Sequence, residues 1–159
     1  MADVDLCPIT EENWLECAML TMEPGEERFV APNIWGIAER QFSPALVTRA
    51  IYHGNTMVGF VMYYYRDRPD TADPVMGNAW QIVRFMIAVE HRHQGFGRAA
   101  IHAVIKEIQR TPDRHECDIV LLSYRPGNDA AARLYTRLGF EEVGVGSRNQ
   151  IIMRRSLRS

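Results

Sequence analysis

The sequence lacks the features of a membrane protein, of a disulfide-stapled secreted domain and of a zinc module. No apolar run reaches the roughly 18 residues that a membrane-spanning helix needs. The first residues, MADVDLCPITEE, are acidic and have no basic start followed by an apolar core, so no secretory signal is expected. The three cysteines are an odd number without a CxxC pair, which favours reduced thiols over a zinc site. We therefore expect a cytoplasmic protein that neither enters a membrane nor binds a metal.

An excess of charge of one sign is also missing. The chain has 18 basic and 20 acidic side chains and a formal net charge of −2, which is too balanced to predict nucleic-acid binding. The distribution is uneven, because residues 1–41 hold nine acids and two bases, whereas the remaining residues hold eleven acids and sixteen bases. We expect the first region to attract cations and the remainder to attract anions, although two ordinary solvated faces would give the same pattern.

With 159 residues, 47% of them hydrophobic, the chain is long enough for one domain with a substantial core, and we assign residues 1–159 to a single domain. Strand-type and helix-type patterns follow one another as in a mixed α/β layer. Thr10, Asn33 and Asn128 are the expected N-caps of three helices, and Gly139 is the expected C-terminal cap of the last one. Strands are predicted over 4–9, 46–52, 57–65, 79–89, 117–124, 140–145 and 151–156, and helices over 11–21, 34–40, 98–110 and 129–138.

Two glycines, Gly95 and Gly97, stand in the run RHQGFGR (92–98), between a predicted strand and a predicted helix. Glycine lets a ligand approach the backbone closely, and the free N–H groups of a helix N-terminus attract an anion. A dinucleotide-binding fingerprint needs a third glycine where Ala100 stands, and a Walker A loop needs a Gly-Lys-Ser/Thr sequence that this run does not have. On spacing alone, the run fits a phosphate cradle and a simple turn equally well.

A second pattern lies beyond the next predicted strand. Residues 128–140, NDAAARLYTRLGF, have the form N-x-x-A-x-x-L-Y-x-x-L-G-F. Together with the R-x-x-G-x-G of residues 92–97, this pattern resembles the GNAT superfamily of N-acetyltransferases, and the order of strands and helices agrees over the whole chain. The resemblance implies an α/β (α+β) fold with a mixed, mostly antiparallel sheet of six to seven strands, about four flanking helices and a splayed central strand pair.

The resemblance also implies acetyl-coenzyme A (acetyl-CoA) as the donor, bound where the two parallel central strands separate. Main-chain groups of Phe85 and Ile87 would pair with the pantetheine arm as another strand does, and Asn128 would contact the same arm. The N–H groups of residues 92–98 would bind the pyrophosphate, and no metal is implied. The implied donor-binding residues are Phe85, Met86, Ile87, Arg92, His93, Gln94, Gly95, Phe96, Gly97, Arg98 and Asn128.

Tyr135 matches the superfamily tyrosine that protonates the departing thiolate. In this reaction a neutral amine attacks the thioester carbonyl. Proton transfer from a phenol of pKa about 10 to a thiolate whose conjugate acid has a pKa of about 8.5 is uphill by only about 2 kcal/mol, so the assignment is chemically sound. A tyrosine packed on a helix face for bulk is the alternative.

The general base is not evident from the sequence. The strand segment 80–84 contains no carboxylate, so water or an acid of the N-terminal region would take the amine proton. We interpret Arg84, a charge inside an apolar run, as one half of a structural ion pair rather than as a substrate contact. We place His91 and His93 on the exposed edge of the loop.

The acceptor is expected to be an amine, and segments 27–41, 58–65 and 83–87 resemble the bacterial diamine and polyamine (spermidine/spermine-type) N-acetyltransferases. In the superfamily the first two helices wall the acceptor site, and here that region is acidic. Carboxylates would bind ammonium groups, and aromatic rings would contact them through cation–π interactions. The candidate substrate-binding residues are Glu26, Glu27, Glu39, Trp35, Tyr63 and Tyr65.

Other functions fit the same pattern. One is a GNAT acetyltransferase that acts on a protein N-terminus or on an aminoglycoside-type antibiotic, because an acidic site suits an aminoglycoside as well. Another is a module that binds acetyl-CoA as a sensor without transferring the acetyl group. A homodimer is the oligomeric state that the resemblance implies.

Overall fold

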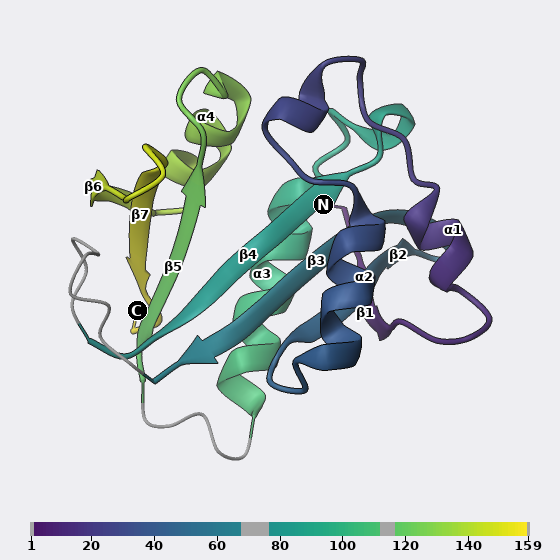
Figure 1. The fold of residues 1–159 in the computed structure, drawn as a ribbon, viewed down its shortest axis with the longest axis horizontal. Coiled ribbons are helices and arrows are strands. Elements are labelled where there is room, and N and C mark those ends of the chain that lie inside the picture. Colours follow the sequence, from purple (N-terminus) through teal and green to yellow (C-terminus); the bar gives the residue numbers. More distant parts are fainter. Residues whose placement is uncertain (1, 68–76, 112–116, 159) are drawn as a thin grey trace.

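Seven strands form one sheet through the middle of the molecule (Figure 1). The structure is a computed structural model that describes residues 2–67, 77–111 and 117–158. The strand order is β1-β2-β3-β4-β5-β7-β6, and every neighbouring pair is antiparallel except β4 and β5. The predicted mixed, mostly antiparallel sheet is therefore confirmed. The strands are β1 (Asp5–Pro8), β2 (Val47–His53), β3 (Thr56–Arg66), β4 (Ala79–Ile87), β5 (Ile119–Tyr124), β6 (Glu141–Val145) and β7 (Ile151–Ser156).

The parallel pair at the centre of the sheet separates part of the way along its length. β4 and β5 are paired only over residues 80–82 and 120–122, although both strands continue further. The separation begins next to Val83. Consecutive residues of β3 pair with Ile82 and Arg84 of β4, so Val83 between them is an extra, unpaired residue. Such a bulge bends the strand and increases its twist. Figure 1 shows β4 and β5 diverging, which confirms the predicted splayed pair.

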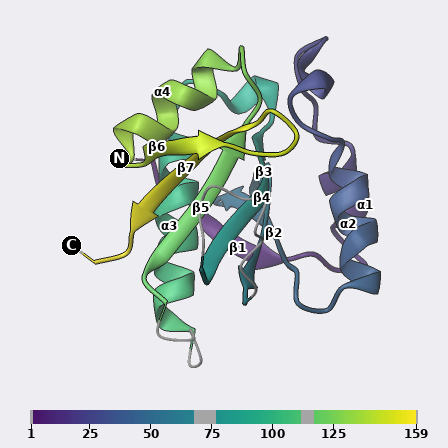
Figure 2. The same cartoon turned by 60° about the vertical axis from the view of Figure 1, so that its left-hand side comes forward.

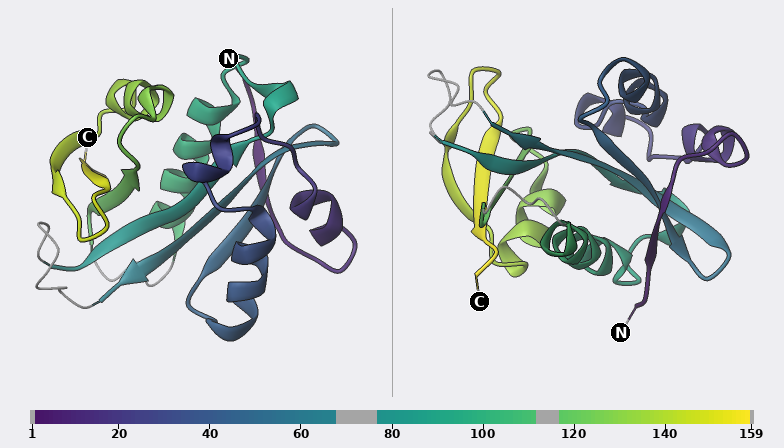
Figure 3. Two further views of the ribbon diagram at one scale, coloured as in Figure 1. Left: turned by 45° about the horizontal axis from the view of Figure 1, so that its top comes forward. Right: turned by 90° about the horizontal axis from the view of Figure 1, so that it is seen from below.

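Helices cover both faces of the sheet, and Figures 2 and 3 separate the two layers. On one face, Cys17 and Ile37 of the first two helices pack with Phe60 of β3. On the other face, Val104 and Ile108 of the long third helix pack against the sheet, as does part of the fourth helix. Within the described residues, none of the helices combines the length and the apolar character that crossing a membrane requires. The helices are α1 (Trp14–Ala18), α2 (Asn33–Phe42), α3 (Phe96–Arg110) and α4 (Asp129–Arg137), with 3-10 turns η1 (Glu26–Arg28) and η2 (Val89–His91).

The first helix is shorter than its sequence pattern predicts. We predicted a helix over residues 11–21 with Thr10 as its N-cap, whereas α1 has five residues. Asn13 accepts a hydrogen bond from the Thr10 N–H (2.7 Å) and donates one to the Pro8 carbonyl (3.0 Å). Because these bonds close a turn, the chain enters the helix about one turn later than predicted.

Asparagines at two other helix starts have different roles. Asn33 is the first residue of α2 rather than its cap, and its Nδ2 donates to the Cys17 carbonyl (2.9 Å), which ties α2 to α1. Asn128 is the N-cap of α4, since its Oδ1 accepts a hydrogen bond from the Ala131 N–H (3.2 Å). Gly139 follows the same helix with a φ of 86°, a left-handed conformation that favours glycine. Both predicted caps of α4 are confirmed.

Candidate active site

The separation of β4 and β5 opens into a cavity of about 1700 Å³. Its walls come from the splayed strand ends, the start of α3, one side of α4, and the segment that contains η1 and α2. Gln94 is the one predicted donor-binding residue that does not line it. The predicted donor-binding residues that line it, together with the predicted acid, are Phe85, Met86, Ile87, Arg92, His93, Gly95, Phe96, Gly97, Arg98, Asn128 and Tyr135.

The last residues of β4 present backbone groups to this cavity. The Ala88 N–H donates to the Val58 carbonyl beside β3 (2.8 Å), and the Met86 carbonyl faces β3 as well. Backbone groups alternate in direction along a strand, so those of Phe85 and Ile87 point away from β3 and toward the gap. An extended chain that carries amide groups can pair with this edge, which is the pairing predicted for the pantetheine arm.

The loop before α3 makes a tight turn beside the same strand end. His93 and Gly95 have φ values of 62° and 83°, and α3 then begins at Phe96 without a side-chain cap. The N–H groups of its first turn therefore have no partner within the helix and attract an anion. A Cβ added at Gly97 would lie 3.4 Å from Leu134 Cδ2 and 3.8 Å from Phe85 Cζ, so the glycine lets the start of α3 pack closely against α4 and the end of β4. The residues present fit a diphosphate group.

The two arginines of this loop differ in their surroundings. Arg98 is exposed in the first turn of α3. Arg92 is half-buried, and its Nε donates to the Ile87 carbonyl (2.9 Å) while its Nη1 pairs with Glu26 of η1. A phosphate that recruits Arg92 therefore competes with two protein groups.

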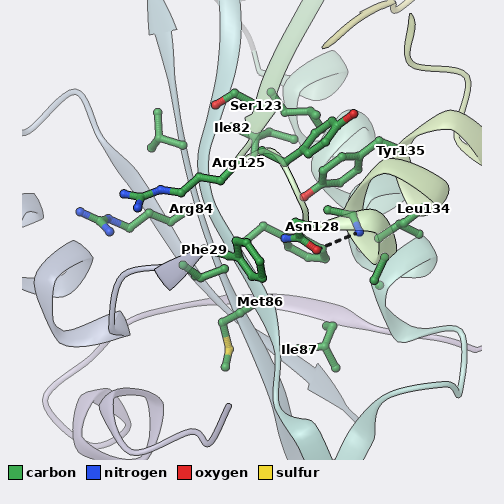
Figure 4. A pocket seen from close by; sticks show the side chains of 18 of the residues that line it. Phe29, Ile82, Arg84, Met86, Ile87, Ser123, Arg125, Asn128, Leu134 and Tyr135 are labelled. Carbon is green, nitrogen blue, oxygen red and sulfur yellow. Dashed lines mark hydrogen bonds between the residues drawn. The ribbon is translucent and has the colours of Figure 1, made fainter. Parts of the chain in front are cut away.

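Tyr135 projects from α4 into the cavity. Its side chain is only 7% exposed, and its ring packs against those of Tyr124 and Phe140, with centroids 6.4 and 6.1 Å away. Burial raises the pKa of the Tyr135 phenol above its usual value, so the group is neutral near pH 7. Figure 4 shows the hydroxyl directed into the cavity on the side of Asn128. A protonated hydroxyl at this place is the state that a general acid requires.

Arg84 forms the ion pair that we predicted for it. Its Nη2 pairs with the carboxylate of Glu39 on α2. The arginine side chain lies across Gly36, where an added Cβ would be 2.9 Å from Arg84 Cδ. The expected ion pair of Arg84 is therefore present, and its partner is Glu39, a predicted substrate-binding acid; the structural role of Arg84 stays a prediction, since Arg84 also lines the cavity.

Of the other predicted substrate-binding residues in the N-terminal region, some line the cavity and one does not. Glu26 lines the cavity, but its carboxylate is bonded to Arg92 and also accepts the Glu23 N–H (2.9 Å). Glu27 is exposed, does not line the cavity, and accepts the N–H of Gly25 (3.0 Å). Trp35 lines the cavity and is 60% exposed. The structure thus brings Glu26, Glu39 and Trp35 to the site and leaves Glu27 outside it.

Tyr63 and Tyr65 lie on the opposite face of the sheet from the acceptor wall. Tyr63 is 2% exposed and its hydroxyl donates to Glu107 of α3, while the Tyr65 ring packs on Trp80 at 5.4 Å. Side chains alternate between the two faces of a strand, so the residue between them, Tyr64, lines the cavity instead. Sequence reasoning missed Tyr64, although its register with Phe60 and Met62, two residues of the α2-facing core, would have identified it.

Two further lining residues were missed, and they lie in irregular segments. Phe29 follows η1, and its ring carbons lie 3.9 Å from a Cβ built on Gly127. Arg125 follows β5, and its Nη1 donates to the Arg28 carbonyl (2.9 Å). No periodic pattern marks these turns, so the sequence carries no signal for their meeting across the cavity.

Comparison with families of known proteins gives the class of this protein. Residues 7–140 match the acetyltransferase (GNAT) family, so the chain belongs to this family. The resemblance found in the sequence is therefore confirmed.

Two sequence relatives come from Bacillus subtilis. They are the spermine/spermidine N(1)-acetyltransferase of strain 168 and the probable spermine N(1)-acetyltransferase of subspecies natto, strain BEST195. Each is 32% identical to this chain over 94 residues. The matched region covers 59% of this chain and 59% of each relative, which is less than two thirds of either protein.

Solved structures share the fold over nearly the whole chain. The aminoglycoside acetyltransferase AAC(6')-Ib in complex with coenzyme A has a TM-score of 0.74 at 14% identity, over 97% of this chain and 95% of that one. The ribosomal-protein-S18-alanine N-acetyltransferase from Escherichia coli has a TM-score of 0.67 at 17% identity, over 98% and 95%. At these identities the likeness concerns the fold alone.

Proposed function

We propose that this protein transfers the acetyl group of acetyl-CoA to a primary amine. The observation that carries the proposal is one cavity into which the end of β4 beyond its pairing with β5, an open helix N-terminus and a buried tyrosine all face. Membership of the acetyltransferase family supports acetyl transfer, and the coenzyme A complex of a structural relative supports the donor. Acetyl-CoA supplies an acetyl group that is activated as a thioester.

Two parts of the chain bind the donor in this proposal. Backbone groups of Phe85 and Ile87 pair with amide groups of the pantetheine arm. The N–H groups at the start of α3 bind the pyrophosphate, and Arg92 and Arg98 add charge-assisted hydrogen bonds. Asn128 uses its Oδ1 for the α4 cap, which leaves its Nδ2 group to donate to the arm.

The chain then assists direct attack of the neutral amine on the thioester carbonyl. A backbone N–H of the β4 edge donates to the carbonyl oxygen, where negative charge develops. Tyr135 gives its phenolic proton to the sulfur as the C–S bond breaks, and the proton that the amine nitrogen loses passes to water, from which the phenolate is reprotonated. Burial makes the phenol a weaker acid, but the same low-dielectric surroundings also make the thiolate more basic, so the transfer stays balanced.

A diamine or polyamine is the acceptor class that the sequence relatives favour, since both are named as acetyltransferases of spermine. A protein N-terminus or an aminoglycoside is the alternative, in line with the names of the structural relatives. An acidic acceptor wall would favour a polyamine as well, because carboxylates bind ammonium groups. In the cavity, however, Glu26 and Glu39 are each paired with an arginine, so the relatives alone carry the polyamine candidate.

Release of free CoA from acetyl-CoA, measured over a panel of amines, tests the proposal. The wild-type protein is expected to release CoA only when an amine is present. Tyr135→Phe is expected to lower kcat by about 10²- to 10⁴-fold and to leave the Kd for acetyl-CoA unchanged. Tyr52→Phe, on β2 and outside the cavity, is the matched control.

Two results would contradict parts of this proposal. Tight binding of acetyl-CoA without amine-dependent CoA release from any amine would indicate a sensor rather than an enzyme. An unchanged kcat in Tyr135→Phe would show that another group, or water, protonates the thiolate.

A further inference from the structure

The acceptor side of the cavity carries unpaired positive charge. Among the described lining residues, the carboxylates are those of Glu26 and Glu39, and each already pairs with an arginine. The other lining arginines form no ion pair within the described part of the chain; they are Arg28, Arg98, Arg125, Arg133, Arg137 and Arg148. The region that the sequence marks as acidic therefore contributes at most one free carboxylate to the cavity, that of Glu26 when Arg92 turns from it to the pyrophosphate, while Glu39 stays paired with Arg84.

One of these arginines, Arg125, contacts the backbone of η1 at Arg28. Arg125 Nη1 donates to the Arg28 carbonyl at 2.9 Å, and the Arg28 guanidinium lies over the Phe29 ring, 4.6 Å from its centroid. The Phe29 ring in turn lies beside Gly127, which immediately precedes Asn128, the cap of α4. The guanidinium groups of Arg28 and Arg125 thus lie on the part of the cavity wall next to the start of α4, the helix that carries Tyr135.

Arg84 and Arg125 lie on the same side of the cavity but differ in whether their charge is paired. Figure 4 shows the guanidinium groups of Arg84 and Arg125 on the side of the cavity away from Tyr135. Arg84 is neutralised by Glu39, whereas Arg125 keeps its charge. An acceptor whose amine reaches the thioester near Tyr135 would therefore place the rest of its structure toward Arg125.

Charge decides which acceptors suit this arrangement. A polyamine carries further ammonium groups at pH 7, and these would lie beside cations, which costs binding free energy. A carboxylate would instead form a bidentate, charge-assisted pair with a guanidinium fork. Neighbouring arginines also lower the pKa of the attacking ammonium group and so increase the neutral fraction that attacks the thioester.

We infer that the acceptor is a small amine that also bears a carboxylate, and that Arg125 binds this carboxylate with Arg28 beside it. The inference rests on the proposed acetyl transfer and deepens it. Since a polyamine has no carboxylate, the inference and the polyamine candidate exclude each other.

Matched pairs of amines test the substrate class. Each pair consists of an amino acid and its decarboxylated amine: ornithine and putrescine, lysine and cadaverine, tyrosine and tyramine. Spermidine is added as the polyamine. At least one amino acid is expected to have a kcat/KM about 10-fold or more above that of its decarboxylated partner. Turnover of spermidine or the decarboxylated amines alone would overturn the inference and leave the proposed acetyl transfer intact, whereas no turnover of any amine would overturn both.

A second experiment tests the role of Arg125. Arg125→Gln is expected to raise the KM for the carboxylated acceptor by about 10- to 100-fold and to change kcat much less, with the Kd for acetyl-CoA unchanged. Arg125→Lys keeps the charge without the fork and is expected to recover part of the loss. Arg110→Gln, at the exposed end of α3 and outside the cavity, is the control. An equal effect of Arg125→Gln on both members of an amine pair would overturn the assignment.

Discussion

Arg92 and Glu26 form an ion pair that joins the loop after β4 to η1, which belongs to the N-terminal wall of the cavity. The same guanidinium donates to the Ile87 carbonyl, one of the backbone groups proposed to bind the pantetheine arm. Donor binding is thus coupled to the N-terminal wall, because Arg92 cannot serve the pyrophosphate and remain bonded to both protein groups.

Removing the Glu26 carboxylate is expected to strengthen CoA binding. In Glu26→Gln the competitor for Arg92 is weakened, and the Kd for CoA is expected to fall about two- to fivefold at low ionic strength, in line with the small free energies of partly exposed ion pairs. Arg92→Gln is expected to raise the same Kd by about 10-fold. Isothermal titration with CoA measures both, and Glu27→Gln is the control because Glu27 bonds only locally. A higher Kd in Glu26→Gln would show instead that the pair is needed to shape the site.

Replacement of the two loop glycines by alanine is expected to have different effects, on CoA affinity for Gly97 and on stability for Gly95. Gly97 is helical and has ordinary space for a Cβ, so Gly97→Ala is expected to leave the free energy of unfolding within about 0.5 kcal/mol of wild type. The new methyl group lies beside the helix N-terminus, however, and is expected to weaken CoA binding by about 10-fold or more. Gly95 has a φ of 83°, so Gly95→Ala is expected to destabilise the fold by about 1–2 kcal/mol. Urea unfolding and CoA titration separate the two effects, and wild-type CoA affinity in Gly97→Ala would argue against a phosphate beside Gly97.

The regular elements were predictable from the sequence because their signals are local. The apolar pattern of α3 and the caps of α4, Asn128 and Gly139, each lie within one segment and were found where predicted. The turn closed by Asn13, which shortens α1, depends on contacts with Thr10 and Pro8 that periodicity does not contain. Boundaries of this kind are therefore the part of the fold that the pattern misses.

The site was predictable only where a motif specifies it. Residues of the glycine loop and Tyr135 line one cavity, as the two motifs imply. Charge counts did not reveal that Glu39 faces Arg84, and an aromatic cluster did not reveal which strand face Tyr64 occupies, because both depend on register and packing between distant segments. The homodimer and the cytoplasmic location stay predictions.

Tyr135 is expected to make the stability of the protein depend on pH only under alkaline conditions. Burial raises the pKa of the folded phenol above its unfolded value of about 10. Below pH 10 both states hold the proton, and the free energy of unfolding does not change through this group. Above pH 10 the unfolded chain loses its proton first, so the free energy of unfolding falls by up to about 1.4 kcal/mol per pH unit for this group. Urea unfolding between pH 8 and 11.5 measures the fall.

The comparison of wild type with Tyr135→Phe isolates this contribution. The variant has no proton to lose at this position, so its free energy of unfolding is expected to decrease less steeply above pH 10. Tyr52→Phe is the control, and Tyr63, whose pKa is also raised by burial, contributes equally to both proteins and cancels in the difference. Parallel curves for wild type and Tyr135→Phe would contradict the burial of an uncharged phenol.

Substitutions of Tyr63 and Tyr64, neighbours on β3, are expected to change different quantities: the free energy of unfolding for Tyr63 and the KM for the acceptor for Tyr64. Tyr63→Phe removes the hydrogen bond to Glu107 inside the α3-facing core and is expected to cost about 1–2 kcal/mol of unfolding free energy without changing the KM for the acceptor. Tyr64→Leu removes an aromatic wall of the cavity and is expected to raise that KM by about fivefold, from about 1 kcal/mol of lost contact. Urea unfolding and steady-state kinetics on both variants check the pair. A change of acceptor KM in Tyr63→Phe, with none in Tyr64→Leu, would place the acceptor on the other face of the sheet and contradict the assignment of this cavity.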